Sequence, residues 1–543
     1  MKRFLAILLV FMVVTVALPF TASAVLPGED KYSGDQLTSG NFKYIVNSNK
    51  AIITDFVATP SDHLVIPEVL GGYPVVAIYD YAFVNCTDIT SIVLPEGLKE
   101  IARGAFKGCT SLKSIYIPST VTSIDDSVFT LCSSLSNIYI TDLRAWCEID
   151  FWDEASNPLN YAENFYVNGE KLDLNGNFTF PYGITRIGEG VLRGVDSIKS
   201  VTIPATVKCI GHRAFDNCTG LEAVYITSLK QWCEIEFENI DSNPLYYADT
   251  LYVEGTEVSG NLVIPLGTLK IKDFAFAGYN KISGVIIPST VSSIGFCAFY
   301  ECEGLTDITI PDSVKTIEKS AFIDCTGLKS VTLPSTLTEI KSRTFYGCTS
   351  LESIVIPESV KTIGEFAFTN CYALKKLVLP NSLRVIDDCA FWDCDSLTIV
   401  KIPNGVTTIG SYAFRYCDSL MAINIPDSAT SVGTKVFEKC DNLTIYYGEL
   451  PPEIEYQEPE TPENPENPEN PENPENPEIP EDPENPENPE NPENPENPET
   501  PENPVPTGNT SSANVVALCS LAAIICITIL LINRRKKSIS DAQ

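Results

Sequence analysis

The sequence predicts an α/β-type repeat solenoid, in which short parallel strands stack turn upon turn along one axis. A cysteine recurs every 23 residues from Cys302 to Cys440, and Cys86, Cys109 and Cys132 keep the same spacing near the start. A phenylalanine precedes nearly every one of these cysteines by three residues. Between each cysteine and the next phenylalanine along the chain lies an apolar stretch that ends at a proline. A fixed period of this length indicates one supersecondary unit that stacks on the next.

Each copy of the unit is expected to contribute one strand. The clearest copy reads Leu328-x-x-Val331-x-Leu333-Pro334, where apolar residues alternate before the proline. Alternation of this kind is typical of a short strand, and proline is tolerated at its end. The strands of successive copies are therefore predicted to form one long parallel sheet.

The recurring phenylalanine and cysteine are interpreted as core residues. Thirteen repeats carry the cysteine or a substitute, and the substitutes Val195 and Tyr279 cannot cross-link. Neighbouring side chains on parallel units point the same way, which suits a disulfide poorly. We therefore expect a row of buried thiols and a spine of packed aromatic rings.

The first 66 residues are expected to contain a signal peptide and a cap. Residues 1–24 have a basic start, an apolar stretch and a small-residue cleavage site, which is typical of a secretory signal peptide. Residues 25–66 contain two apolar runs around Asn47-Ser48-Asn49-Lys50, which predicts a hairpin. A solenoid needs an atypical cap of this kind over its exposed end. The solenoid itself is assigned to residues 67–447.

Two similar inserts interrupt the repeats, at about residues 141–180 and 227–264. Their sequences match at a constant offset of 86 residues, for example Trp146-Cys147-Glu148-Ile149 with Trp232-Cys233-Glu234-Ile235. Each insert is predicted to form a short helix followed by a hairpin near a glycine. Two such similar inserts indicate duplication of a block.

The residues after 447 are expected to attach the solenoid to the cell. Residues 448–514 are assigned as a stalk, in which the Pro-Glu-Asn triplets from Pro459 to Pro504 match the period of the polyproline II helix. The stretch 453–504 holds 19 acidic residues and no Lys or Arg, so it supplies more than half of the net charge of -34. Residues 515–532 are apolar enough to span a membrane, and the basic residues 533–543 would lie in the cytoplasm. An acidic chain of this kind also excludes nucleic acid as a partner.

The repeat resembles the BspA-like, or Treponema-type, leucine-rich repeats of bacterial surface proteins. The elements Cys-x-x-Leu-x-x-Ile-x-Ile-Pro and Ile-x-x-x-Ala-Phe carry this resemblance over most of the mature chain. It implies a leucine-rich-repeat solenoid at a cell surface and a role in adhesion. The C-terminal end resembles a Gram-positive sorting signal, although only Thr507 and Gly508 match its Leu-Pro-x-Thr-Gly motif. Retention by the membrane segment and covalent attachment to the cell wall therefore both stay open.

The sequence does not indicate catalysis, a cofactor or a metal. His63 and His212 are the only histidines, and they lie far apart in a linear stack. They cannot supply a two-histidine metal site or a convincing catalytic triad. No glycine-rich phosphate loop is present. We therefore expect a protein that is not an enzyme, with no catalytic, cofactor-binding or metal-binding residues.

Two surfaces are candidates for ligand binding. The first is the exposed strand position seven residues after each recurring cysteine, expected on the concave side, where Tyr116, Tyr139 and Tyr225 fall. Strand propensity alone also explains tyrosine at this position. The second surface is the inserts, where Trp152 is the best candidate for an exposed contact because its counterpart is Glu238. Trp146 and Trp232 are expected to pack in small cores against the solenoid flank.

The predicted function is non-catalytic adhesion at the cell surface. The expected partners are extracellular-matrix, mucin or cell-surface proteins or glycans of a host, or other bacteria. A structural envelope protein without a specific ligand is the main alternative. An enzyme that acts on surface glycans is a third and weaker one, because a regular solenoid offers few deep clefts.

Overall fold

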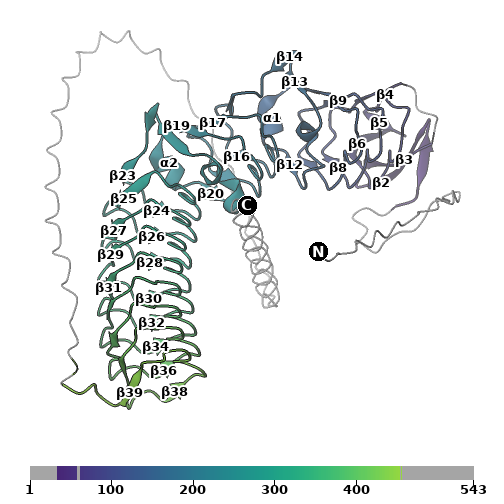
Figure 1. Ribbon diagram of the computed structural model, residues 1–543. Coiled ribbons are helices and arrows are strands. Elements are labelled where there is room, and N and C mark those ends of the chain that lie inside the picture. Colours follow the sequence, from purple (N-terminus) through teal and green to yellow (C-terminus); the bar gives the residue numbers. More distant parts are fainter. Residues whose placement is uncertain (1–33, 58–61, 453, 455–543) are drawn as a thin grey trace, which may run out of the picture. The chain divides into compact units, whose positions relative to one another are not determined.

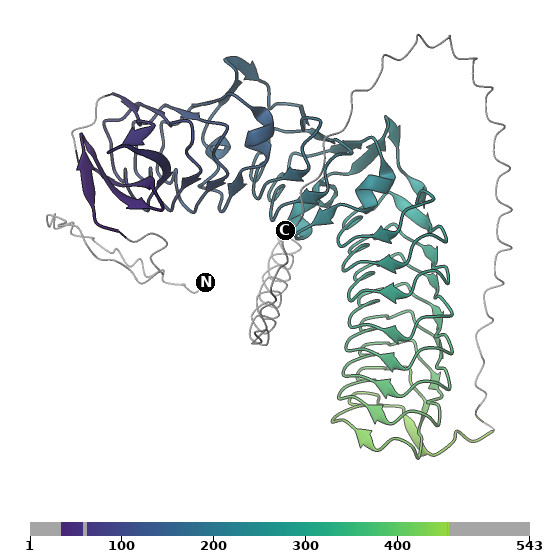
Figure 2. The ribbon, with the colours of Figure 1, turned by 180° about the vertical axis from the view of Figure 1, so that it is seen from behind.

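The computed structural model describes residues 34–57, 62–452 and 454, which form a parallel-strand solenoid of about 17 turns (Figures 1 and 2). The predicted signal peptide, most of the stalk, the membrane segment and the basic tail lie outside these residues. The expectation of an α/β-type fold is wrong in one respect, because the solenoid contains little helix. Its two α-helices in the described residues, α1 (Leu143–Cys147) and α2 (Leu229–Cys233), have five residues each.

Each turn contributes two strands rather than the single strand predicted. The longer strand forms the first strand row and contains the alternating apolar stretch. Its members are β4 (His63–Val65), β7 (Ser91–Val93), β9 (Ser114–Ile117), β11 (Asn137–Ile140), β13 (Asn164–Val167), β15 (Asn177–Thr179), β17 (Ser200–Ile203), β19 (Ala223–Ile226), β21 (Thr250–Val253), β23 (Gly260–Val263), β25 (Ile282–Ile286), β27 (Asp307–Thr309), β29 (Ser330–Thr332), β31 (Ser353–Val355), β33 (Lys376–Val378), β35 (Ile399–Val400), β37 (Ala422–Ile425) and β39 (Thr444–Tyr447).

The shorter strand follows the proline turn and forms the second strand row, where a buried isoleucine usually ends the strand. Its members are β6 (Tyr73–Ile78), β8 (Glu100–Ile101), β10 (Ser123–Ile124), β12 (Asp150–Phe151), β16 (Arg186–Ile187), β18 (Cys209–Ile210), β20 (Glu236–Phe237), β24 (Lys270–Ile271), β26 (Ser293–Ile294), β28 (Thr316–Ile317), β30 (Glu339–Ile340), β32 (Thr362–Ile363), β34 (Val385–Ile386), β36 (Thr408–Ile409) and β38 (Ser431–Val432).

The N-terminal end is covered by antiparallel strands. The predicted hairpin is present as β2 (Phe42–Asn47) and β3 (Lys50–Phe56), and β1 (Leu37–Ser39) pairs with β2. β3 then pairs in parallel with β6, which joins the cap to the second strand row. The short β5 (Val69–Leu70) pairs with β6 as well.

The side opposite the strands closes through tight turns instead of helices. In one typical repeat, Phe366 and Asn370 have φ angles of 58° and 62°, which a right-handed helix cannot contain. The backbone amides of these turns donate to carbonyls of the next repeat, as from Phe368 N to Ala390 O at 2.8 Å. The turns are therefore held between repeats, and this pairing replaces the hydrogen bonds that a helix would make within one repeat.

The phenylalanine spine and the row of thiols are both present. Between Phe276 and Phe414 the rings of successive repeats stack with centroids 5.2–5.5 Å apart. The sixteen cysteines of the described residues are free. The thiol of Cys394 donates to the carbonyl oxygen of Phe368, 26 residues earlier, at 3.2 Å, and Cys348 pairs with Phe322 in the same way. The cysteine thus satisfies a buried backbone carbonyl that an aliphatic residue would leave without this donor.

The two inserts extend the solenoid instead of standing on its flank, which corrects the sequence interpretation. In the first insert, β12 pairs in parallel with β10, and β13 pairs in parallel with β11. α1 replaces the usual proline turn, and it begins at Leu143 because the Asp142 side chain accepts from Arg144 N at 2.8 Å. Trp146 and Trp232 consequently lie in the main core and not in separate small cores. Three 3₁₀ helices complete the inserts: η1 (Pro158–Asn160), η2 (Ile240–Ser242) and η3 (Pro244–Tyr246).

Each insert ends in a hairpin that interrupts the first strand row. β14 (Glu170–Leu172) pairs antiparallel with β13, and β22 (Thr256–Glu257) pairs antiparallel with β21. Each hairpin strand occupies the edge where the next parallel strand would pair, so the predicted single long sheet is broken there. The hairpins divide the solenoid into a first block (residues 62–172), a second block (177–257) and a third block (260–447).

Candidate functional site

The third residue of β4, β7, β9, β11 and β13 faces solvent, because side chains alternate along a strand. In the first block these residues are aligned by the parallel register in the order Val65, Val93, Tyr116, Tyr139, Tyr166. The intervening isoleucines point inward and are fully buried. The exposed face of the first block therefore carries two valines followed by three tyrosines.

The three tyrosines stack on one another as parallel plates. The ring centroids of Tyr116 and Tyr139 are 4.4 Å apart, and those of Tyr139 and Tyr166 are 4.7 Å apart, with 10° between the planes in both pairs. Burial, together with the neighbouring phenols, raises the pKa of Tyr139. Both faces of Tyr139 are covered, whereas Tyr116 has no stacked ring on the side of Val93.

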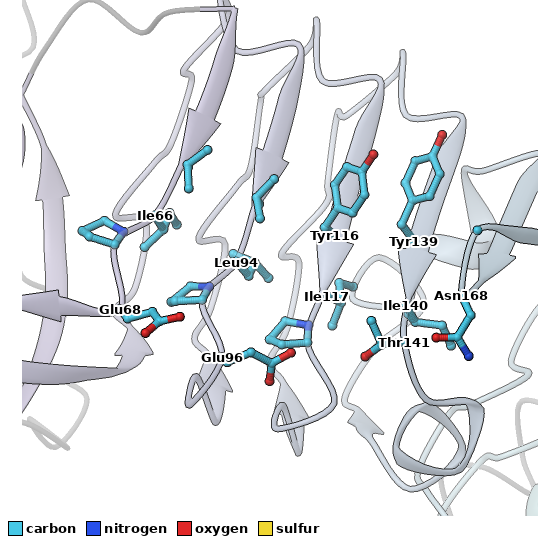
Figure 3. Close-up of a pocket in the computed structure, with 16 residues that line it drawn as sticks. Ile66, Glu68, Leu94, Glu96, Tyr116, Ile117, Tyr139, Ile140, Thr141 and Asn168 are labelled. Atoms are coloured by element: carbon cyan, nitrogen blue, oxygen red, sulfur yellow. The ribbon is translucent and has the colours of Figure 1, made fainter.

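An apolar groove of about 660 Å³ runs along this face (Figure 3). The tyrosine rings lie along one side, and residues that follow the strands lie along the other. The lining residues are Val65, Ile66, Pro67, Glu68, Val93, Leu94, Pro95, Glu96, Tyr116, Ile117, Pro118, Tyr139, Ile140, Thr141, Asn168 and Gly169. Asn168 and Gly169 belong to the turn between β13 and β14, so the first insert closes one end of the groove.

The predicted site residues do not all meet at this groove. Tyr116 and Tyr139 line it. Tyr225 lies in the second block, where it stacks on Tyr252 at 4.8 Å in an equivalent but separate pair. Trp152 follows β12 in the second strand row and is 53% exposed, and its indole nitrogen donates to Ser123 Oγ at 3.3 Å. Trp152 is therefore exposed as expected but belongs to another surface.

Sequence reasoning did not place three residues of this face, which are Tyr166 of the tyrosine stack and Glu68 and Glu96 of the groove. Tyr166 lies in an insert, so the 23-residue spacing did not place it in register with Tyr139. Glu68 and Glu96 are exposed residues that directly follow the prolines after β4 and β7. The recurring proline is a signal that could have located both glutamates, because the residue after the proline occupies an equivalent position in every repeat.

The remaining polar chemistry is sparse. His63 lies on β4 and contacts Ser91 Oγ, whereas His212 follows β18 and lies 3.4 Å from Glu189. Within residues 34–57, 62–452 and 454, no group of three metal-ligating side chains gathers. No helix in that part of the chain is long and apolar enough to cross a bilayer.

The stacked turns, the free thiols and the phenylalanine spine all repeat with one period. A family model described as a BspA type leucine-rich repeat region of six copies matches residues 69–149, 170–248, 255–371 and 327–444. The chain belongs to this BspA-type leucine-rich-repeat family. The match covers well over half of the chain and includes both insert-bearing blocks.

Solved structures of bacterial leucine-rich-repeat proteins are similar to the chain. A leucine-rich-repeat protein from Bacteroides ovatus is 24% identical, with 75% of this chain and 94% of that chain covered and a TM-score of 0.38. One from Eubacterium ventriosum is 18% identical, with coverages of 70% and 95% and a TM-score of 0.41. A leucine rich cell surface protein from Faecalibacterium prausnitzii is 23% identical, with coverages of 77% and 96% and a TM-score of 0.33. No curated protein matches the chain. The assignment rests on the family match.

Proposed function

We propose that this BspA-type protein is a non-catalytic adhesin that binds a protein or glycan of a host or of another microbe in the groove of its first block. The groove carries the proposal, because it combines an apolar floor with stacked tyrosines on one face of the scaffold. Tyrosine is enriched at the energetic centres of binding interfaces, and a concave, mostly apolar groove is the usual form of a ligand site. Leucine-rich-repeat proteins in general bind proteins or other ligands.

The proposed location is the cell surface, with attachment at the C-terminus. The family and the cell-surface relative from Faecalibacterium support the surface part of this proposal. The signal peptide at residues 1–24 and the membrane segment at 515–532 remain predictions from the sequence. The Pro-Glu-Asn tract would then hold the solenoid away from the membrane.

The test is a binding screen with a variant that fills the groove. The purified full-length chain is presented to matrix proteins, mucins, glycans and bacterial cells, and saturable binding is measured. Val93→Trp places a large ring beside Tyr116 and is expected to reduce binding at least about tenfold. Thr332→Trp is the matched control, because Thr332 has the same strand position in β29 of the third block.

Two results would contradict this function. A folded chain that binds no ligand in the screen would favour a structural envelope protein. If binding survives Val93→Trp but is lost in Trp152→Ala, the binding site lies on the surface of the second strand row. Unfolding midpoints of all variants must match the parent for either conclusion.

A further inference from the structure

The charged side chains of the groove are all acidic. Among the sixteen lining residues, Glu68 and Glu96 are the charged ones, and there is no Lys or Arg. Both are exposed, and each follows a strand of the part of the groove where the outward position is a valine. The negative charge and the open hollow therefore coincide over β4 and β7.

The tyrosine stack leaves one aromatic face available in this hollow. Tyr139 is covered by Tyr116 on one side and by Tyr166 on the other. The outer face of Tyr116 lies next to Val93, which has no ring to stack on it, and Tyr116 remains 41% exposed. A cation over an open aromatic face is attracted by the ring, and more so beside a carboxylate.

We propose that the groove takes a Lys or Arg side chain of an extended polypeptide partner. The apolar stem lies over Val65 and Val93 against the open face of Tyr116, and the cationic head reaches the side of Glu68 and Glu96. Long basic side chains bind in this manner because their stems are apolar while their heads need a charge partner. This inference rests on the proposed function and names the chemistry of the partner.

Other occupants fit the groove less well. A glycan that stacks along a row of aromatic rings needs several open ring faces, and here both faces of Tyr139 are covered and only the outer face of Tyr116 has no stacked ring. The sequence of the Pro-Glu-Asn tract predicts the extended form that aromatic grooves accept, and a second copy could offer it, but its stretch 453–504 has 19 acidic residues and no basic ones. Glu68 and Glu96 would repel it. Charge complementarity therefore selects a basic segment.

The test compares two short labelled peptides that differ only in charge. Both are rich in Ser and Pro and stay extended, and one carries two Arg residues where the other carries Gln. Binding to the full-length chain is measured by fluorescence anisotropy at about 150 mM salt, where long-range attraction to the acidic tract is screened. The Arg peptide is expected to bind roughly tenfold more tightly than the Gln peptide.

Three variants locate the effect. Glu68→Gln with Glu96→Gln should reduce the preference for Arg to about twofold or less, and Tyr116→Leu should reduce it about threefold. Glu358→Gln is the matched control, because Glu358 follows the proline after β31 in the third block, where the exposed strand residue is Val355. This control is expected to keep the full preference.

The failures of the two proposals differ. Suppose that Val93→Trp abolishes binding of a ligand from the screen, but Arg and Gln peptides bind equally or the double glutamine variant binds as the parent does. The groove then binds by other chemistry, and the inference is wrong while the proposed function stands. A neutral glycan whose binding survives both glutamine substitutions has the same meaning. If no peptide or ligand responds to Val93→Trp, the proposed function and the inference fail together.

Discussion

The first and third blocks have the same interior but different exposed faces. Phe106 and Phe368 are both fully buried, and Cys132 and Cys394 each donate to a phenylalanine carbonyl 26 residues earlier. On the exposed face, however, the first block carries stacked tyrosines and a groove, whereas β27 and β29 of the third block carry threonines. The repeated residues therefore build the scaffold, and the outward strand position is where the two blocks differ.

The largest expected effect tests the shared interior through pH. Burial raises the pKa of the thiols of Cys325, Cys348 and Cys394 well above the usual range, while an unfolded thiol has a pKa of about 8.5. The unfolded state thus loses its protons first as pH rises, so the stabilising contribution is complete below about pH 8.5 and falls above it. Above about pH 8.5, each buried thiol should lower the free energy of unfolding by about 1.4 kcal/mol per pH unit.

The measurement is urea unfolding at several pH values between about 7 and 10. The unfolding free energy of the parent should fall steeply above about pH 9. Limited proteolysis should then cleave the third block first, because that block holds nine cysteines and the first block holds four. Cys325→Ala with Cys348→Ala is the control and should show a shallower decline. Unchanged unfolding free energy across this range would contradict the buried thiol row.

The second prediction tests whether the phenylalanine spine contributes equally to the stability of the first and third blocks. Phe106→Ala and Phe368→Ala should each cost about 3–5 kcal/mol, because each leaves a cavity between stacked neighbours. Phe366→Ala is the matched control, because this ring is only half-buried, lies on the surface beneath Arg343 at 4.7 Å and should cost about 1 kcal/mol. Chemical unfolding checks all three. Equal midpoints for Phe366→Ala and Phe368→Ala would remove the distinction between spine and surface.

The sequence predicted the features that repeat and failed on those that do not. The period located the turns, the phenylalanine spine and the thiols, because each is one residue type copied at one place. The alternating pattern also placed Tyr116 and Tyr139 on the exposed face. Tyr166 was missed because α1 and the residues around it lengthen the turn between Tyr139 and Tyr166 to 27 residues. The register of a strand depends on how the preceding turn packs, and spacing alone does not reveal that.

The lack of long helices in the described residues was only partly signalled by the sequence pattern. Phe366 gives no signal of its positive φ angle, whereas the position of Asn370 is occupied by Gly, Asn or Asp in most repeats, as at Gly347 and Asp393. Their conformation is held by hydrogen bonds to the next repeat, such as that from Asn370 N to Trp392 O. The groove likewise arises where the exposed residue changes from Val93 in one repeat to Tyr116 in the next. The sequence of one repeat alone does not show this difference.

The third prediction compares the two ends of the thiol row. Burial raises the pKa of Cys86 to about 11, whereas the interaction with the neighbouring Cys417 thiol lowers the pKa of Cys440. The thiolate is the reactive form, so Cys440 should be alkylated roughly tenfold faster than Cys86 at about pH 8. Iodoacetamide labelling followed by peptide mass spectrometry measures both sites in one sample. Cys417→Ala should slow Cys440, and faster labelling of Cys86 would contradict the assignment.

The smallest expected effect asks whether the exposed face can be exchanged between blocks. Thr309 and Thr332 are directly paired across β27 and β29, as Tyr116 and Tyr139 are across β9 and β11. Thr309→Tyr with Thr332→Tyr should build a stacked pair, and the two substitutions together should be about 0.5–1 kcal/mol more stable than the sum of each alone. Urea unfolding of the double-mutant cycle measures this coupling energy.

The matched control is Thr309→Tyr with Val355→Tyr, which lie two strands apart and should show no coupling. Coupling in the neighbouring pair alone would mean that tyrosine rows assemble wherever adjacent exposed positions allow, without help from the core. The tyrosine row of the first block would then depend only on which residues occupy the exposed strand positions, and the fold would be stable without it. A neighbouring pair that destabilises the third block would instead show that the tyrosines of the first block depend on their own scaffold, including the hairpin of β13 and β14 that ends the row.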